Sequence, residues 1–411
     1  MTVYKLDKFP LKVILCFLVF TEILTFIGPI DFYIPNKILL ISYLFILNFS
    51  FYKGYQWGLR TFKPSKYDLS RNTIYLFLIL GFIGSVTGLY LAWSAKGLSI
   101  SFSTLIYALS NPGDTYNSDG EILNLPTFFV IFSIFKYSLL PITFYTWNRL
   151  PSFYKVLALL GISFQLVTWL GIGTRKGIFD ILFVAFFLYI LNIKNLWYNS
   201  KYKKRKICVC VSTIIIFLSY FIFSNLSRGN STLGDVTDEF LRMPIRDIYL
   251  DVMPIGIIYI LYSITFYLSH GYYALSFALS EYGIITPKIL STDWFSIAQV
   301  NKFGYDALSG SYIDLLQAQG VDMTNHWHSA YVWFANEFTF IFVPFVIFII
   351  AYFLAKTWKD SLYGRNILSS ISFSSFIIMS FYLFANTNFL SSSFIPFVFW
   401  LFLYLISWAR V

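Results

Sequence analysis

The chain has 411 residues, of which 57% are hydrophobic and 12% are charged, and its formal net charge is +10. A mean hydropathy of +0.67 excludes an ordinary water-soluble domain and predicts a polytopic membrane protein. Most of the positive charge falls in short loops between hydrophobic runs. Membrane topology and anionic lipid headgroups explain it there, so we exclude nucleic-acid binding as a function.

Hydrophobic runs follow one another along most of the chain, and they approach or reach the roughly 20 residues that a helix needs to cross a bilayer. In chain order these runs are 11–30, 38–52, 72–93, 126–145, 156–170, 177–192, 207–224, 338–354, 367–384 and 394–408. They are apolar on every face, which predicts helices. The stretch 254–282 is apolar enough for two short spans or a re-entrant hairpin, with His270 and Gly271 near its turn. We therefore expect 10–12 membrane segments.

These runs divide the chain into three parts. They are an N-terminal transmembrane bundle of about seven spans (1–224), a long periplasmic loop with short or re-entrant helices (225–329), and about three C-terminal spans (330–411). The first run has no small-residue cleavage pattern after it, so it is expected to stay as a signal anchor. Cys16, Cys208 and Cys210 have no disulfide or zinc spacing and are expected to be inert. We expect no cofactor.

Lysine and arginine placement predicts the orientation. If the basic run 201–206 is cytoplasmic, alternation of ten spans puts both termini and 20 of the 30 basic residues on the cytoplasmic side. The segments 94–125, 171–177 and 225–329 then face outward. Cations that lie on the outer side against this rule are candidates for binding an anion.

One outward group is the turn 171–177, where Arg175 and Lys176 open a helix. Free backbone N–H groups and the positive end of the helix dipole favour phosphate at such a position. The alternative is that both side chains reach out to lipid headgroups.

A second group comprises Arg228, Arg242 and Arg246. Arg242 and Arg246 are four residues apart, so on a helical turn they project from one face and could clamp a pyrophosphate, although Pro244 limits how regular that turn is. The alternative is ordinary loop ion pairing with neighbouring carboxylates, which are Asp238, Glu239, Asp247 and Asp251.

A third group is the segment 325–331, which holds two of the three histidines of the chain, His326 and His328, just before a hydrophobic run. A His-X-His pair can ligate a metal, but no further ligands stand at useful spacing. Proton transfer fits better, because imidazole titrates near neutrality. Asn325, Trp327 and Tyr331 are candidates for contacting a sugar, with interface anchoring as the alternative for the two aromatic residues.

Ionisable residues also fall within predicted spans, where they are costly unless they line a cavity or are paired. They are Glu22, Lys136, Asp180 and Glu337. Functional placement and internal ion pairing are both open for each of them.

Three segments together carry a resemblance to a known family: the turn 171–177, the segment 267–275 (YLSHGYYAL) and the segment 326–334 (HWHSAYVWF). The chain resembles the O-antigen polymerases, the Wzy family, over nearly its whole length. That resemblance implies a GT-C-like integral-membrane glycosyltransferase in the bacterial inner membrane, with its active site facing the periplasm. It implies an inverting, metal-independent transfer of a growing glycan from undecaprenyl pyrophosphate to the non-reducing end of a new lipid-linked repeat unit. It also implies a Wzz-type chain-length regulator as a partner.

Together with the residue patterns described above, the resemblance predicts roles for individual residues. The candidate bases are His328 and His326, with Asp247 and Glu239 in reserve. The candidates for binding the pyrophosphate are Arg175, Lys176, Arg228, Arg242 and Arg246. The candidates for binding the glycan are His270, Asn325, Trp327 and Tyr331. The alternatives are an O-antigen ligase, which would share the donor, and a polysaccharide flippase or transporter, which would not need a polar outer loop of this length.

Overall fold

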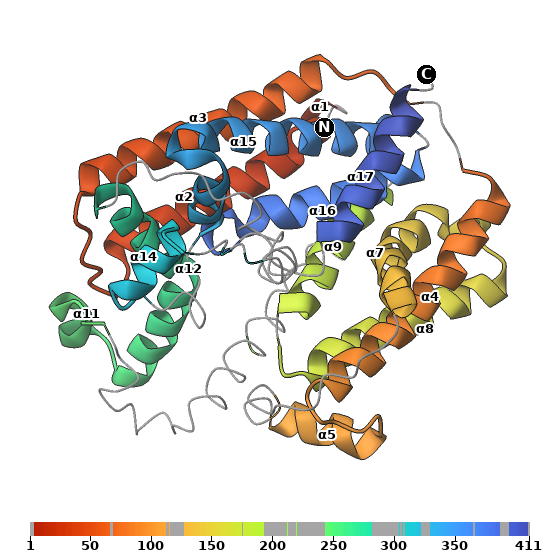
Figure 1. Ribbon diagram of the computed structural model, residues 1–411, viewed down its shortest axis with the longest axis horizontal. Coiled ribbons are helices and arrows are strands. Elements are labelled where there is room, and N and C mark those ends of the chain that lie inside the picture. Colours follow the sequence, from red (N-terminus) through yellow and green to blue (C-terminus); the bar gives the residue numbers. More distant parts are fainter. Residues whose placement is uncertain are drawn as a thin grey trace.

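The computed structural model describes residues 4–65, 69–111, 115, 127–174, 176–192, 212, 219, 243–281, 304, 306, 309–321, 329–364, 366–386 and 394–409 (Figure 1). Within these ranges the regular structure is helical, and the one β-type pairing is an isolated antiparallel bridge between Ile30 and Ile245. Backbone hydrogen bonds satisfied inside each helix are what a bilayer requires.

Six described helices are long and apolar enough to cross a membrane: α2 (Phe9–Ile27), α3 (Lys37–Arg60), α4 (Arg71–Ser94), α8 (Ser152–Gly171), α15 (Ala330–Tyr363), and α16 (Ile367–Phe381) together with η2 (Tyr382–Phe384). Further apolar helices are α7 (Thr127–Thr146), α9 (Lys176–Asn192) and α17 (Phe394–Ala409). The chain is thus an all-α polytopic membrane protein.

Nine of the ten expected hydrophobic runs coincide with these nine helices, and the tenth, 207–224, lies outside the described residues. Two of the predicted runs are shorter than the helices that contain them. The run 38–52 belongs to the 24-residue helix α3, and the run 338–354 belongs to the 34-residue helix α15. Polar residues near the helix ends lowered the local hydropathy, although the backbone continues as a helix through them.

The expected turn at His270 and Gly271 is wrong. These residues lie inside a single 27-residue helix, α12 (Ile255–Glu281), so 254–282 forms neither two short spans nor a hairpin. A side chain at position 271 would overlap the carbonyl oxygen of Phe384. The glycine therefore permits a close approach between helices, and glycine alone does not end a helix.

The first hydrophobic core joins α2, α3, α9, α12, α15 and α16. Its closest helix pair is α3 with α15, which run in the same direction. Gly54 lies on the backbone of Phe348, and Gly58 lies on that of Tyr352, so the missing side chains let the two helices touch. Small residues spaced by four allow this approach in membranes, where dispersion contacts rather than water exclusion hold helices together.

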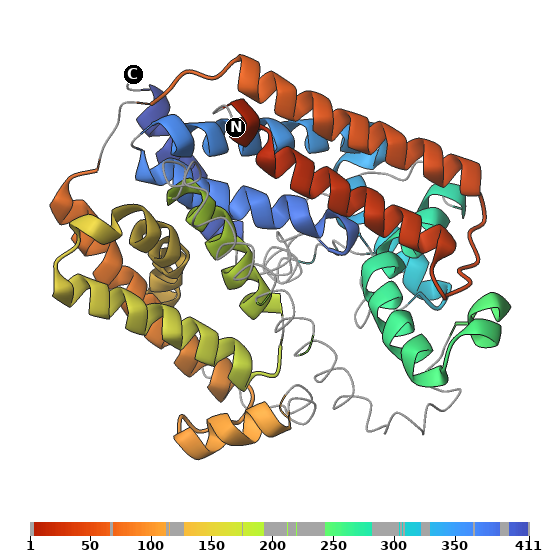
Figure 2. The ribbon, with the colours of Figure 1, turned by 180° about the vertical axis from the view of Figure 1, so that it is seen from behind.

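The second core joins α4, α7, α8 and α17 with the start of α16. Gly81 of α4 and Gly161 of α8 both pack on Leu139 of α7. The indole of Trp400 donates a hydrogen bond to the carbonyl of Ile134 at 3.0 Å, which fixes α17 against α7. Figure 2 shows α4, α7 and α8 on one side of the molecule and α2 and α3 on the other.

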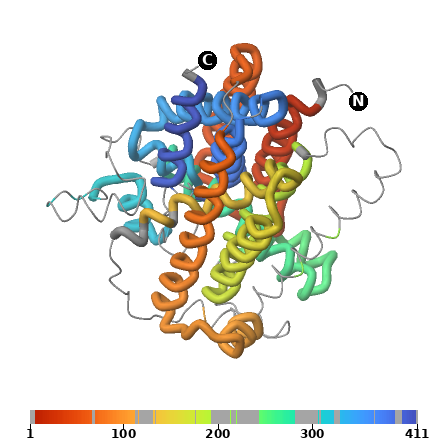
Figure 3. The backbone as a smooth tube through the Cα atoms, turned by 90° about the vertical axis from the view of Figure 1, so that its right-hand side faces the viewer, coloured from red at the N-terminus to blue at the C-terminus, as the bar shows by residue number. Residues whose placement is uncertain are grey.

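The bundle has two distinct ends. We call one the basic end: both termini of the described chain lie there (Figure 3), as do the ends of α3 and α15 and the starts of α4 and α8. Its basic residues include Lys8, Lys12, Lys53, Arg60, Lys63, Arg71, Arg149, Lys155, Lys356 and Lys359. The opposite end, which we call the far end, carries the short helices α5 (Phe102–Ser110), α11 (Asp247–Val252) and α14 (Tyr312–Ala318).

Candidate functional site

Three segments that are remote in sequence meet at the far end. Gly271, in the middle of α12, faces the backbone of Phe384 in η2 and the backbone nitrogen of Ser329. Ser329 in turn donates its N–H to the carbonyl of Ala385 at 2.8 Å. The middle of α12, the start of α15 and the end of η2 therefore form one junction, which we call the far-end junction.

The start of α9 joins the same junction through Tyr382. The ammonium group of Lys176 lies 5.0 Å from the centre of the Tyr382 ring. It also forms an ion pair with Asp180, one turn further along α9, with a nitrogen–oxygen distance of 3.1 Å. Asp180 interacts with the Tyr382 hydroxyl, and Tyr267 of α12 lies within electrostatic range of that hydroxyl. Lys176 is thus held beside α12 with its side chain still one-third exposed.

Packing and backbone conformation explain the glycines of the turn before α9. Gly171 lies on the ring of Trp93, Gly177 lies on the ring of Trp169, and Gly173 has a φ of +64°, which a larger residue rarely adopts. The pattern that suggested a phosphate-binding loop therefore has a structural explanation for its glycines. Lys176 has a structural role in its contacts with Asp180 and Tyr382, and its side chain is still one-third exposed.

His270 lies in the junction and is buried. Its ring packs 4.7 Å from the ring of Phe266 and 5.6 Å from that of Tyr273, measured between centroids. His270 was expected to contact the glycan. Because aromatic side chains of α12 surround it, a sugar could reach it only if the rings of Phe266 and Tyr273 moved aside.

Tyr331 is also buried, with 1% of its surface exposed, and its ring faces are therefore not available for anchoring at the membrane interface. It belongs to a polar group inside the bundle, together with Glu22 of α2 and Tyr272 of α12, whose charges and hydroxyls lie within electrostatic range. Both carboxylate oxygens of Glu22 accept from the amide of Asn48, at 2.7 and 2.9 Å. The partner of Glu22 is thus a neutral amide and not the cation that internal ion pairing would supply.

Arg246 and Asp247 lie at the rim of the far end, beside the end of α2. The guanidinium of Arg246 bonds to the carbonyl of Phe26 and lies 3.5 Å from Asp31. A cation at a helix C-terminus is favourable because the helix dipole is negative there. The partner of Arg246 is thus Asp31, which is none of the four carboxylates considered from the sequence. Asp247 is the exposed first residue of α11.

The other expected site residues lie outside the described part of the chain. They are Arg175, Arg228, Glu239, Arg242, Asn325, His326, Trp327 and His328. Arg175 directly precedes Lys176 in the sequence, and His328 directly precedes Ser329.

Two further ionisable residues that the sequence singled out lie elsewhere. The backbone carbonyl of Lys136 in α7 accepts from Gln165 at 3.0 Å, and its ammonium lies over the ring of Tyr137. Glu337 lies in α15, partly buried. Within the described ranges, no three side chains of His, Cys, Asp or Glu gather as a metal site would need.

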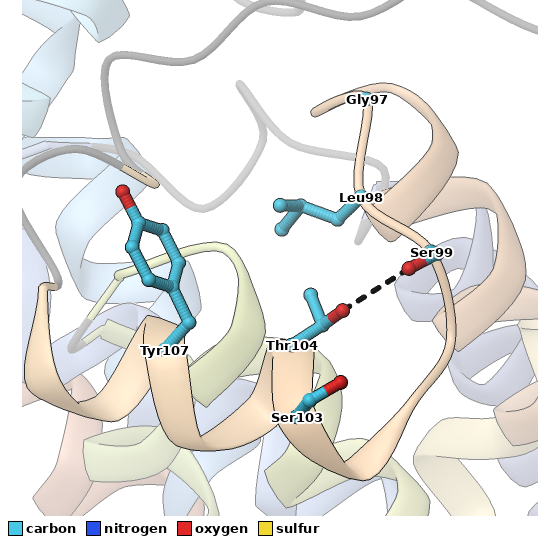
Figure 4. Close-up of a pocket in the computed structure, with 6 residues that line it drawn as sticks. All are labelled: Gly97, Leu98, Ser99, Ser103, Thr104 and Tyr107. Carbon is cyan, nitrogen blue, oxygen red and sulfur yellow. Dashed lines mark hydrogen bonds between the residues drawn. The ribbon is translucent and has the colours of Figure 1, made fainter.

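A shallow pocket of about 380 Å³ lies between the turn after α4 and the start of α5 (Figure 4). Gly97, Leu98, Ser99, Ser103, Thr104 and Tyr107 line it. Its lining offers hydroxyl groups and an aromatic ring. It contains neither a cation for a phosphate nor an acid–base pair, so we do not place a reaction there.

Sequence reasoning found Lys176, Asp180, Tyr331 and Glu22, but it missed Tyr382 and Tyr272, which connect them. No local pattern marks those two tyrosines among the 31 of the chain.

Comparison of the chain with protein-family models, with curated proteins and with solved structures finds no match.

Proposed function

We propose that the chain is an oligosaccharide repeat-unit polymerase of the O-antigen polymerase type. The observation that carries the proposal is the meeting, at one end of a helical membrane protein, of the segments in which the family resemblance lies. Lys176 of the 171–177 segment lies over the ring of Tyr382, whose hydroxyl is within electrostatic range of Tyr267 in α12. Gly271 in the 267–275 segment lies against the backbone nitrogen of Ser329, just before α15. A ligand held at this end would contact all three segments.

The proposed reaction is displacement at an anomeric carbon. A hydroxyl oxygen of the new lipid-linked repeat unit bonds to the anomeric carbon of the growing glycan. The bond from that carbon to the pyrophosphate oxygen breaks, and its electron pair leaves with undecaprenyl pyrophosphate. The proton of the attacking hydroxyl passes to a base, for which we propose His328 or His326.

The role proposed for Lys176 is to stabilise the charge that develops on the departing pyrophosphate. A cation at a helix N-terminus is suited to this, and Asp180 with the Tyr382 ring would hold it in place before the substrate arrives. Arg175, Arg228 and Arg242 are the further candidates. Arg246 is a weaker candidate, because it already interacts with Asp31 and the end of α2.

In this proposal the far end faces the periplasm, the basic end and both termini are cytoplasmic, and the membrane is the bacterial inner membrane. The concentration of basic residues at one end supports this orientation. A chain-length regulator is the proposed protein partner.

The test is lipopolysaccharide banding in a strain whose own copy is deleted, complemented at matched membrane levels with wild type, Lys176→Ala, Lys176→Arg or His328→Ala. Lys155→Ala is the matched control, because Lys155 stacks on Trp147 at the basic end, 5.4 Å from the ring centre. We expect core plus one repeat unit in the deletion strain, a ladder with wild type and with Lys155→Ala, and loss of the ladder with Lys176→Ala and His328→Ala. Lys176→Arg keeps the charge and should retain part of the ladder.

Two results would contradict the proposal in different ways. A deletion strain with core and no repeat unit would indicate the ligase or the flippase instead. A full ladder with every variant would leave the polymerase function in place and overturn the assignment of the site.

A further inference from the structure

Helix α5 carries large apolar side chains on its outer surface although it is too short to cross a membrane. Phe102 is 77% exposed, Ile106 51% and Leu109 39%. Their spacing of four and three residues places them on one stripe of the helix. A monomer in water rarely leaves such a stripe uncovered, so something apolar is expected to lie against it.

Outside the apolar stripe, the exposed surface of α5 carries hydroxyl groups, including that of Tyr107, which is 48% exposed. Ser103 and Ser110 are exposed beside the apolar stripe, and Ala108, on the other side, is buried. The hydroxyl of Ser101 pairs with those of Ser103 and Thr104, at 2.9 and 2.7 Å, and also accepts from the backbone N–H of Thr104 at 3.0 Å. Figure 4 shows the hydroxyl of Thr104 directed toward Ser99 of the preceding turn, with that of Ser103 nearby and that of Tyr107 apart from both. No charged residue occurs between positions 98 and 111.

The depth of α5 follows from the helix before it. The 24 residues of α4 span about 36 Å, against a hydrocarbon core of about 30 Å, so its last residue, Ser94, reaches the lipid–water boundary. The connecting turn stays there, because the N–H of Leu98 bonds to the carbonyl of Trp93 at 2.9 Å. In Figures 1 and 3, α5 lies across the far ends of α4 and α8 rather than in line with them.

The apolar outer surface of α4 and α8 is continuous with that of α5. Exposed apolar residues run along α4 and α8, the two helices whose ends α5 crosses; they are Leu76, Ile79, Val86, Tyr90, Val156, Leu159 and Leu160. These residues require acyl chains around them in any membrane-spanning arrangement. An apolar stripe that continues this surface at boundary depth fits the same lipid leaflet better than a separate protein partner.

We propose that α5 is an interfacial helix, which inserts Phe102, Ile106 and Leu109 among the lipids at the far end and keeps Ser103 and Ser110 toward water. It anchors the far end of α4 and α8 at a fixed depth, and so sets the level at which the neighbouring 171–177 turn meets the lipid headgroups. The proposal is independent of the proposed polymerase function.

The test uses depth-dependent fluorescence quenching of the full-length protein in liposomes. Cys16, Cys208 and Cys210 are replaced by serine, and a single cysteine is introduced by Phe102→Cys or, as the matched control on the same helix, by Ser103→Cys. Each is labelled with bimane. Lipids that carry a nitroxide near the top of the acyl chain should quench the label at position 102 several-fold more than the label at position 103, and aqueous iodide should show the reverse order.

Two outcomes would overturn the proposal. Equal, strong quenching of both labels by iodide would place α5 in water. Protection of position 102 from both iodide and nitroxide lipids would mean that protein covers the stripe, and in a purified sample that protein is a second copy of the chain.

Discussion

The two ends of the bundle differ in how a buried asparagine side chain is bonded. At the basic end the bonds join distant parts of the chain: the amide of Asn366 donates to the hydroxyls of Ser65 and Ser407 at 3.1 and 2.9 Å. At the far end the oxygen of Asn336 accepts from the backbone N–H of Tyr312 at 3.0 Å, but its buried amide nitrogen has no hydrogen-bond partner in the described part of the chain. Each end also buries a serine hydroxyl without such a partner, Ser370 at the basic end and Ser329 at the far end. Satisfied polar groups stabilise a fold, whereas unsatisfied ones store free energy that a ligand can recover.

Backbone strain follows the same division. Within the described ranges, the non-glycine residues with positive φ are Ser329, at 56°, and Thr339, at 62°, and both belong to the far-end part of α15. Such conformations cost about 1–3 kcal/mol each and persist where surrounding structure enforces them, often at functional sites. The strained backbone positions therefore lie at the same end of α15 as the far-end junction.

The largest expected loss of stability comes from Asn366→Ala at the basic end. The substitution removes three hydrogen bonds, including one from the backbone N–H of Leu368 at 3.0 Å, in a fully buried position. We expect a loss of about 2–4 kcal/mol, measured as a lower thermal midpoint of the purified protein in detergent. Asn111→Ala is the matched control, since its exposed amide makes a single long bond to Tyr107. An equal decrease in both variants would remove the distinction between the ends.

Gly271→Ala should cost about 1–3 kcal/mol, because the new methyl group would overlap the carbonyl of Phe384 and push α12 away from η2 and Ser329. The measurement is again the thermal midpoint. In the control Gly88→Ala the methyl group would meet only the side chain of Lys136, at 3.8 Å, so the helix propensity of alanine should leave the protein as stable or slightly more stable. If Gly271→Ala were neutral, the far-end junction would not be as tightly packed as described.

Tyr272→Phe removes the hydroxyl that pairs with Thr21 at 3.0 Å inside the bundle. The expected loss is about 1 kcal/mol, the net contribution of one buried hydrogen bond, because the hydroxyl of Thr21 keeps its bond to the carbonyl of Leu18. Tyr249→Phe, which removes an exposed hydroxyl bonded to the carbonyl of Ile27, should have a smaller effect. The reverse order in thermal midpoints would mean that the α2–α12 contact depends little on its polar group.

Asp180→Asn has the smallest expected effect on stability, below about 1 kcal/mol, because its partner Lys176 is partly exposed and the pair is one turn apart on a helix. Its effect on function should be larger: without the carboxylate, Lys176 loses the group that orients it, and lipopolysaccharide chains should shorten. A normal ladder at normal protein levels would show that this orientation is unimportant.

The sequence predicted the membrane helices well, because hydropathy is a local property and each span satisfies its own backbone. It singled out Lys176 and Asp180 separately but did not pair them, although residues four apart on a helix are neighbours. It could not predict that Gly271 serves helix contact rather than a turn, because the contacting carbonyl belongs to Phe384. The pairing of Arg246 with Asp31 was missed for the same reason: an isolated bridge brings the two segments together.

The contact of α3 with α15 has a consequence for the timing of biosynthesis. About 270 residues separate Arg60, at the end of α3, from Ala330, at the start of α15. At a synthesis rate of about 5–20 residues per second, α15 follows α3 after roughly 15–50 s. During that interval the groove over Gly54 and Gly58 is open to lipid or to an insertion factor, so assembly of the bundle depends on a late event in translation, and a chain that stops before residue 330 leaves the groove uncovered.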